Sequence, residues 1–124
     1  MAAPQHAASI SSIGIPREIK RDEQRVALTP DAVRELVSQG LEVRIERDAG
    51  AGAGIDDATF AAAGAALVSR DEAWAAHLVV KVKEPQPEEF PFLRHDLVLF
   101  TYLHLAAYPA VGRALLESGC TSVA

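Results

Sequence analysis

Apolar and polar positions alternate along the chain in short blocks, and these blocks switch between the spacing of strands and the spacing of helices. Short runs of aliphatic and β-branched residues, bounded by glycine, proline or charged residues, predict strands. The expected strands cover residues 13–15, 41–46, 66–68, 78–82, 97–102 and 121–124. Between them lie stretches with apolar residues at helical spacing, so the pattern predicts strands and helices in alternation.

Residues that favour helix starts and ends mark four of the intervening stretches. Thr29 can cap a helix that starts at Pro30, because its hydroxyl can accept a hydrogen bond from a first-turn N–H group. Ser69 and Glu72 have the spacing of a capping box. The expected helices run from Pro30 to Gly40, from Asp56 or Asp57 to about Gly64, from Ser69 through Trp74, and from Pro109 to Gly119. Trp74 and Phe100 are expected in the core.

This alternation predicts an α/β fold of the Rossmann-like or flavodoxin-like kind, with a mostly parallel sheet and helices on both faces. We interpret residues 1–12 as a disordered tail and residues 13–124 as one domain. The sequence stops inside the last expected strand. A strand left half-made would expose its hydrogen-bonding edge, so the fold is expected to be truncated in that strand and the domain to be incomplete.

Composition, net charge and cysteine content limit the classes of protein to which this chain can belong. The chain has 124 residues, of which 49% are hydrophobic, and its net charge is −5. An acidic chain without a basic run is a poor candidate for binding nucleic acid or an anionic membrane, and no apolar run approaches the roughly 20 residues of a membrane span. The single cysteine, Cys120, is interpreted as a small core residue. It fits a reducing compartment, so a cytoplasmic protein is expected.

Three residues of different chemistry fall where strands of the expected sheet end. Ligands of open parallel sheets bind in the crevice beyond the carboxyl ends of the strands. Arg25 lies in the loop after the first strand, Lys83 directly after the fourth and His104 after the fifth. A guanidinium can grip a carboxylate, an ammonium can stabilise charge on a carbonyl oxygen, and a histidine can move a proton. Together they suit a small oxo or amino acid.

Each of these residues also has a purely structural interpretation. Arg25 could pair with Asp22 or Glu23 on the surface, Lys83 could end a strand in solvent, and His104 could be a hydrogen-bonded core histidine. Composition and spacing alone leave the two interpretations about even. No histidine has a partner at metal-ligand spacing, so no metal site is expected.

The glycine-rich segment DAGAGAG, residues 48–54, lies between an expected strand and an expected helix. Its spacing differs from the G-x-G-x-x-G of dinucleotide-binding turns, and it lacks an acidic residue that closes a second strand about 20 residues on in a clean βαβ unit. We interpret the segment as a tight loop, so no cofactor-binding residue is expected in this chain.

Several segments resemble one protein family. The stretches IGIPREIKRDEQRVALTP and DAGAGAGIDDATFAAAGA resemble the alanine dehydrogenases and the related nicotinamide nucleotide transhydrogenase alpha chains. KVKEPQPEEF and LRHDLVLFTYLHLAA look more like alanine dehydrogenase than transhydrogenase. The resemblance spans roughly residues 12–124, and these residues are similar to the amino-terminal part of that family.

The resemblance implies an NAD-dependent oxidative deamination of L-alanine to pyruvate and ammonia. It implies that Arg25 holds the substrate carboxylate, that Lys83 contacts the carboxylate and carbonyl region, and that His104 is the general acid and base. NAD would be bound by a nucleotide-binding domain that this chain lacks, supplied by a longer protein or a partner chain. The family resemblance also allows a homo-oligomer. The chain alone is therefore expected to have no turnover.

Two other hypotheses remain open. The chain could be the corresponding domain of a transhydrogenase alpha chain, which handles nicotinamide nucleotides and no amino acid. It could instead be a non-enzymatic, truncated remnant, which the unfinished final strand favours.

Overall fold

The structure is a computed structural model that describes residues 10–101 and 109–123. It contains six strands, and each pairs in parallel with its neighbours. The strands are β1 (Ser12–Ile15), β2 (Glu42–Glu46), β3 (Ala66–Val68), β4 (Leu78–Val80), β5 (Val98–Phe100) and β6 (Thr121–Val123). The helices are α2 (Pro30–Ser38), α3 (Asp57–Ala62), α4 (Arg70–Trp74) and α5 (Pro109–Ser118), with 3-10 turns η1 (Ala51–Ala53) and η2 (Pro87–Phe92). The predicted α/β alternation is confirmed.

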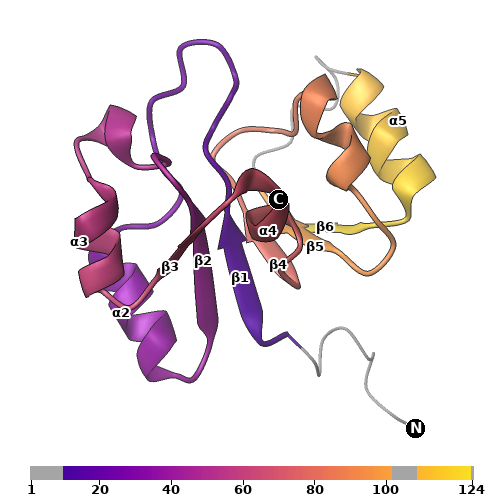
Figure 1. The fold of residues 1–124 in the computed structure, drawn as a ribbon. Helices are drawn as coiled ribbons and strands as arrows, with labels where there is room; N and C mark the ends of the chain where they lie inside the picture. The colour runs from indigo at the N-terminus through magenta and orange to yellow at the C-terminus, as the bar shows by residue number, and fades with distance from the viewer. Residues whose placement is uncertain (1–9, 102–108, 124) are drawn as a thin grey trace, which may run out of the picture.

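The strand order is β3-β2-β1-β4-β5-β6, the order of a doubly wound, Rossmann-type sheet. The chain runs outward from β1 to β3, crosses back through α4, and then runs outward in the other direction from β4 to β6 (Figure 1). The direction therefore reverses between the neighbouring strands β1 and β4. In doubly wound sheets the loops that follow two such strands flank the crevice where ligands bind.

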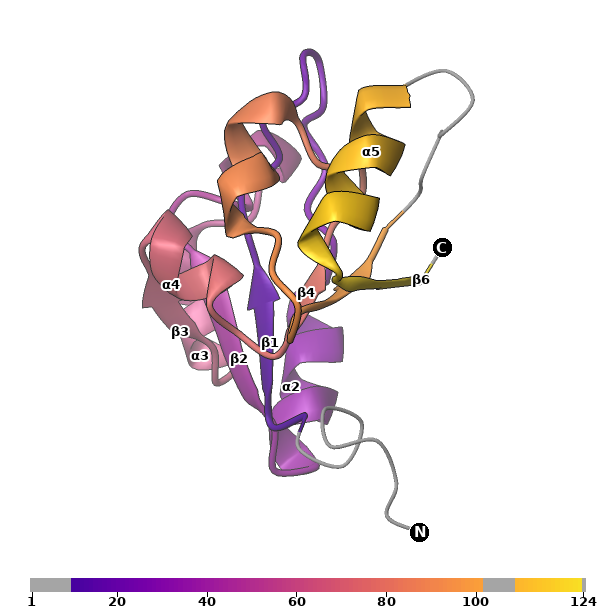
Figure 2. The same cartoon turned by 90° about the vertical axis from the view of Figure 1, so that its right-hand side faces the viewer.

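Helices cover both faces of the sheet, as predicted. Val33 of α2 and Phe60 of α3 pack with Ile13 and Ile45 in one core cluster. On the other face, Trp74 of α4 packs in a second cluster, which is completed by residues of β4, β5, η2 and α5: Val79, Leu93, Leu97, Leu99, Val111 and Leu115. Figure 2 shows α5 and the η2 segment together on that second face.

The predicted helix caps are present. The Thr29 side chain accepts a hydrogen bond from the Ala32 N–H, and Asp56 caps α3 in the same way through Thr59. Ser69 and Glu72 form the expected capping box at the start of α4. Gly40 and Gly119 follow their helices with φ of 88° and 70°, a left-handed conformation that glycine adopts without steric cost. Local hydrogen-bonding chemistry therefore sets most of the element boundaries.

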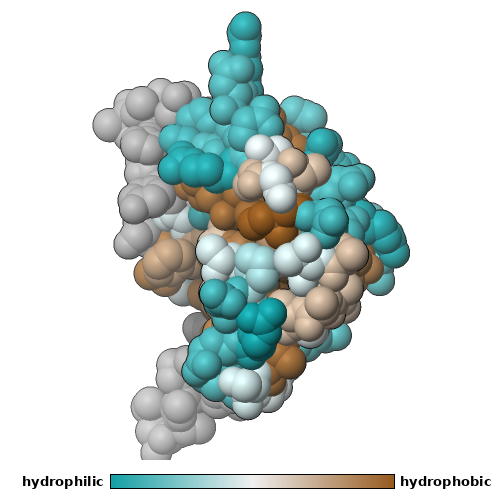
Figure 3. Space-filling model, turned by 90° about the vertical axis from the view of Figure 1, so that its left-hand side faces the viewer, coloured by the Kyte–Doolittle hydropathy of each residue, from teal (hydrophilic) through white to brown (hydrophobic). Residues whose placement is uncertain are grey.

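The prediction that Phe100 belongs to the core is wrong, because its side chain is 50% exposed. Phe100 and Leu99 point to opposite faces of β5, since side chains alternate along a strand. Leu99 packs in the second cluster, whereas Phe100 lies on the face of α2 and α3, which contact β2 and β3 rather than β5. On the side of the molecule that carries α2 and α3, a hydrophobic patch is framed by hydrophilic residues (Figure 3).

Gly14 sets how closely α4 approaches the sheet. A Cβ atom at Gly14 would lie 1.8 Å from the Ala73 carbonyl oxygen, a distance that only a backbone shift could relieve. We expect Gly14→Ala to lower the free energy of unfolding by about 1–3 kcal/mol, the usual cost of overpacking a core. Urea unfolding followed by the fluorescence of Trp74 would measure this. Ala61→Ser, at an exposed position of α3, is the control, and equal stability of both variants would contradict the prediction.

Candidate functional site at the carboxyl edge of the sheet

The loops that leave β1 and β4 bring their charged side chains together at the carboxyl edge of the sheet. The first loop, residues 16–29, carries Glu18, Lys20 and Arg25. The second, residues 81–86, carries Lys81 and Lys83. The two loops follow the strands on either side of the point where the direction of the chain reverses. The structure thus places two of the three predicted site residues at the predicted edge.

Arg25 lies in the first loop with its side chain 66% exposed. Its guanidinium makes a two-bond contact with Glu23, from Nε to Oε2 at 2.9 Å and from Nη2 to Oε1 at 2.8 Å. The backbone N–H of Arg25 also donates to Glu23 Oε2 at 2.8 Å. The pairing with Glu23 that the sequence left open is therefore present. It fixes the direction of the guanidinium, which still lines the hollow described below.

Lys83 is half-buried, and its backbone N–H donates to Glu18 Oε1 at 3.2 Å. Its charge contributes to lowering the pKa of Glu23, which is also the partner of Arg25. Lys83 and Arg25 therefore act on the same carboxylate from two different loops. His104, the third predicted residue, lies outside the described residues.

A buried ionic cluster that the sequence did not predict lies behind these residues. Lys81 Nζ lies 2.9 Å from Glu18 Oε1 and 3.4 Å from Glu89 Oε2, and all three side chains are at most 2% exposed. Burial raises the pKa of Glu89 above its ordinary value, against the opposing effect of the Lys81 charge. Glu89 consequently holds its proton more tightly than an ordinary glutamate, and Glu18 is the closer partner of the buried ammonium.

A second ion pair joins the same two loops. Lys20 Nζ lies 2.7 Å from Glu84 Oε2, and the Glu84 side chain is 2% exposed. Burial by itself would raise the pKa of Glu84, but hydrogen bonds from Lys20 and Gln86, together with the Lys20 charge, bring it below its ordinary value. Gln86 links this pair to the buried cluster, because its backbone N–H donates to Glu89 Oε1 at 2.9 Å.

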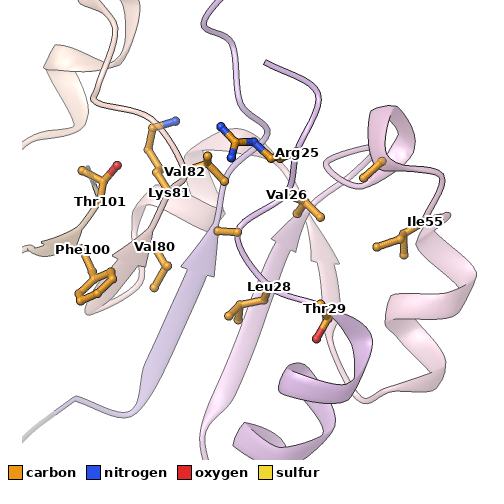
Figure 4. Close-up of a pocket in the computed structure, with 12 residues that line it drawn as sticks. Arg25, Val26, Leu28, Thr29, Ile55, Val80, Lys81, Val82, Phe100 and Thr101 are labelled. Atoms are coloured by element: carbon orange, nitrogen blue, oxygen red, sulfur yellow. The ribbon is translucent and has the colours of Figure 1, made fainter. Parts of the chain in front are cut away.

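A hollow of about 660 Å³ opens beside this edge. Arg25, Lys81 and Thr101 line its polar end, while Val26, Leu28, Val80 and Phe100 line its apolar part (Figure 4). Lys83 is not among its lining residues. The hollow reaches from the charged edge of the sheet along the face that carries Phe100.

The glycine-rich segment forms the tight loop that its sequence predicts. A Cβ at Gly50 would lie 2.6 Å from the Ile55 carbonyl oxygen, and one at Gly52 would lie 2.3 Å from the Gln24 side chain. These glycines are needed for close packing against the protein's own residues. Gly54 has a φ of 80°, which ends η1.

Cys120 and His77 have structural roles. Cys120 packs beside the second core cluster, and burial raises its pKa, so its thiol is not activated as a nucleophile. His77 precedes β4 at the opposite, amino edge of the sheet, where its Nδ1 accepts a hydrogen bond from the Ser11 N–H. Neither belongs to the charged edge.

Sequence reasoning missed Glu18, Lys81 and Glu89 because it treated Lys81 as part of a strand covering residues 78–82. The strand ends at Val80. The available signal was a lysine inside the otherwise apolar run Leu78–Val82, since a lysine in a buried segment requires a carboxylate partner. Nothing local identifies that partner, because Glu18 is 63 residues away along the chain.

The fold and the site define a class: a doubly wound α/β domain with a charged crevice at its topological switch point. A sequence profile described as "Alanine dehydrogenase/PNT, N-terminal domain" matches residues 14–124. The chain belongs to this family.

Individual relatives agree with this assignment. The chain is 49% identical over 113 residues to a Bacillus subtilis alanine dehydrogenase, a match that covers 90% of this chain and 30% of the relative. A solved structure of an L-alanine dehydrogenase superposes with a TM-score of 0.89 at 48% identity, covering 91% of this chain and 32% of that one. A transhydrogenase from Sinorhizobium meliloti superposes with a TM-score of 0.85 at 28% identity, covering 91% and 34%. The chain thus spans about a third of the length of its relatives.

The contact between Glu23 and Arg25 makes a testable prediction about pH. The hydrogen bond from the Arg25 side chain is the largest of the effects that lower the pKa of Glu23 from 4.5 to about 2. Because the folded-state pKa is depressed, this pair stabilises the fold above about pH 4.5, and the contribution disappears as the pH falls towards about 2. NMR titration of the Glu23 carboxyl carbon would measure the midpoint.

Arg25→Met should move this midpoint up towards 4.5. Arg21→Met is the matched control. The Arg21 side chain is 95% exposed, and its Nε lies 4.0 Å from Asp22 Oδ2, so its partner is Asp22 and not Glu23. A midpoint near 4.5 in the unsubstituted chain would show that the contact is not formed in solution.

Proposed function

We propose that this chain is the substrate-binding part of an NAD-dependent alanine dehydrogenase, which converts L-alanine to pyruvate and ammonia. The observation that carries the proposal is the convergence of Arg25 and Lys83, from separate loops, at the carboxyl edge of the sheet. Two cations at a topological switch point suit a small substrate with a carboxylate and a neighbouring carbonyl. Family membership supports the same activity.

Each residue would have a distinct role. Arg25 would bind the substrate carboxylate with its planar guanidinium, whose direction the Glu23 contact fixes. Lys83 would hold the carbonyl oxygen and stabilise the negative charge that develops on it. His104 would transfer protons as ammonia adds to the carbonyl carbon of pyruvate and water leaves, and in reverse during deamination.

NAD would exchange the hydride with the substrate carbon. The glycine loop packs against Ile55 and Gln24, which supports a cofactor site elsewhere. The cofactor would therefore be bound by a nucleotide-binding domain outside these 124 residues. This chain's own residues would bind the substrate, orient it and move protons.

The transhydrogenase alpha chain is the second candidate function, and its solved relative has the same fold at 28% identity. The 48–49% identity to alanine dehydrogenases favours the first candidate. None of the helices in the described part of the chain has the length and apolar character that a membrane span requires.

Activity is best tested in a chimera in which this chain replaces the matching third of the Bacillus subtilis alanine dehydrogenase. We expect oxidation of NADH that requires both pyruvate and ammonium. His104→Ala should lower kcat about a hundredfold or more, the scale of losing a general acid and base. A folded chimera that binds NADH but shows no such oxidation would contradict the proposal, and an unchanged kcat would remove His104 from the mechanism.

The two cations should differ in which kinetic constant they change. Lys83→Ala should lower kcat as well as raise KM, because a group that stabilises developing charge acts most strongly in the transition state. Arg25→Lys should mainly raise KM, because lysine keeps the charge but loses the two-bond geometry. Arg21→Lys, in the same loop with an exposed side chain, is the matched control and should change neither constant. If Lys83→Ala raises KM alone, Lys83 only binds.

The isolated chain should show no turnover, because hydride transfer requires the nicotinamide to be held against the substrate carbon. Purified chain mixed with NADH, pyruvate and ammonium would be followed at the NADH absorbance. A rate that grows with the concentration of the chain and disappears in His104→Ala would contradict this prediction.

A further inference from the structure

We propose that Glu18 is a positioning residue that sets where Lys83 stands relative to Arg25, an inference that rests on the function proposed above. Glu18 accepts hydrogen bonds from three donors, and all three belong to the loop after β4. Its Oε1 accepts from Lys81 Nζ at 2.9 Å and from the Lys83 N–H at 3.2 Å. Its Oε2 accepts from the Val82 N–H at 2.8 Å.

These bonds occur where the chain leaves the sheet after β4. The Lys81 N–H still donates to the Phe100 carbonyl of β5, at 3.0 Å. The next two amides, of Val82 and Lys83, turn to Glu18 instead. A carboxylate suits this place because both of its oxygens accept hydrogen bonds, whereas a neutral amide has one accepting oxygen and a nitrogen that only donates. Glu18 therefore determines the direction in which the chain leaves β4, and with it the starting point of the Lys83 side chain.

The charge of Glu18 is retained in the interior by Lys81. The two side chains are 2% and 1% exposed, so neither charge is compensated by water. An unpaired buried charge costs several kcal/mol, whereas a pair with further hydrogen bonds can offset that cost. The Lys81 ammonium thus faces the Glu18 carboxyl group, which accepts from both amides. Lys81 is in this sense the counter-ion of the positioning group.

The same carboxylate belongs to the loop that carries Arg25. Glu18 lies seven residues before Arg25, between β1 and α2. The Lys20–Glu84 pair, 2.7 Å long, joins these two loops a second time. One buried and one part-buried contact across the switch point therefore hold the loop with the guanidinium against the loop with the ammonium. The distance between the two substrate-binding cations depends on these contacts.

A buried ion pair could serve stability alone, so the test must separate position from stability. Glu18→Gln keeps the size of the side chain and removes its charge and one acceptor oxygen. Arg94→Ala is the matched control, because Arg94 donates at 2.7–3.2 Å to three carbonyls at the end of α4, near the opposite edge of the sheet. It should cost stability without touching the loops of the site.

The first measurement is amide hydrogen exchange of the 124-residue chain by NMR. In Glu18→Gln, the exchange of the Val82 and Lys83 amides should accelerate roughly tenfold more than that of the Val79 amide, the scale of a lost hydrogen bond. In Arg94→Ala, these amides should change together with the rest of the sheet. A uniform acceleration in Glu18→Gln would overturn the positioning role. If Glu18→Gln does not fold, Glu18→Asp, which keeps the charge but is one methylene shorter, takes its place with the same two outcomes.

The second measurement is made in the chimera with the Bacillus subtilis enzyme. Glu18→Gln should lower kcat about ten- to a hundredfold, because a displacement of about 1 Å at a reacting centre can cost this much. Its effect on KM should be smaller, since Arg25 stays paired with Glu23. An unchanged kcat in an active chimera overturns the inference and leaves the proposed function intact. An inactive parent chimera contradicts the proposed function, while the exchange experiment still decides whether Glu18 holds the Lys83 backbone.

Discussion

Glu18 and Lys81 form an ion pair of 2.9 Å in an interior where their side chains are at most 2% exposed. Two charges removed from water are stable together only if the geometry is good and their remaining hydrogen-bonding groups are satisfied. The neighbouring residues meet this requirement: the Val82 and Lys83 amides donate to Glu18, and Glu89 approaches Lys81 from the other side. The course of the chain after β4 is a consequence of this pair.

The position of the pair follows from the topology of the sheet. Where strand order reverses, the loops after β1 and β4 lie side by side and are joined by the Glu18–Lys81 and Lys20–Glu84 pairs. The backbone amides there lack strand partners, and buried amides without partners are costly. A buried carboxylate supplies the missing acceptors. Arg25 and Lys83, the residues that the proposed function assigns to the substrate, lie on the same two loops, so the buried pair and the proposed site share one feature of the fold.

Elements governed by neighbours in sequence were predictable, and those governed by distant residues were not. The capping box of Ser69 and Glu72 and the order of strands and helices follow from local patterns, and the structure confirms them. β4 ends early, at Val80, because the next amides bind Glu18. Glu18 lies 62 residues before that end along the chain, so no local sequence pattern indicates it. Phe100 was placed in the core because a strand of apolar residues does not reveal which of its two faces is covered.

The site was predictable only in part, for a related reason. The strand-end rule selected Arg25 and Lys83 because it depends on sheet topology, and the topology could be read from the alternation of elements. Fold alone would not have assigned chemistry, since a transhydrogenase shares this fold with a TM-score of 0.85 at 28% identity. What separates relatives of one fold is the set of groups at the carboxyl edge. In this chain that edge holds two cations, Arg25 and Lys83, on two loops that the buried Glu18 carboxylate joins. Such an arrangement can hold a small anionic substrate only where the two cations cannot move apart. The buried pair therefore bears on the spacing of the two cations to which the proposed function assigns the substrate.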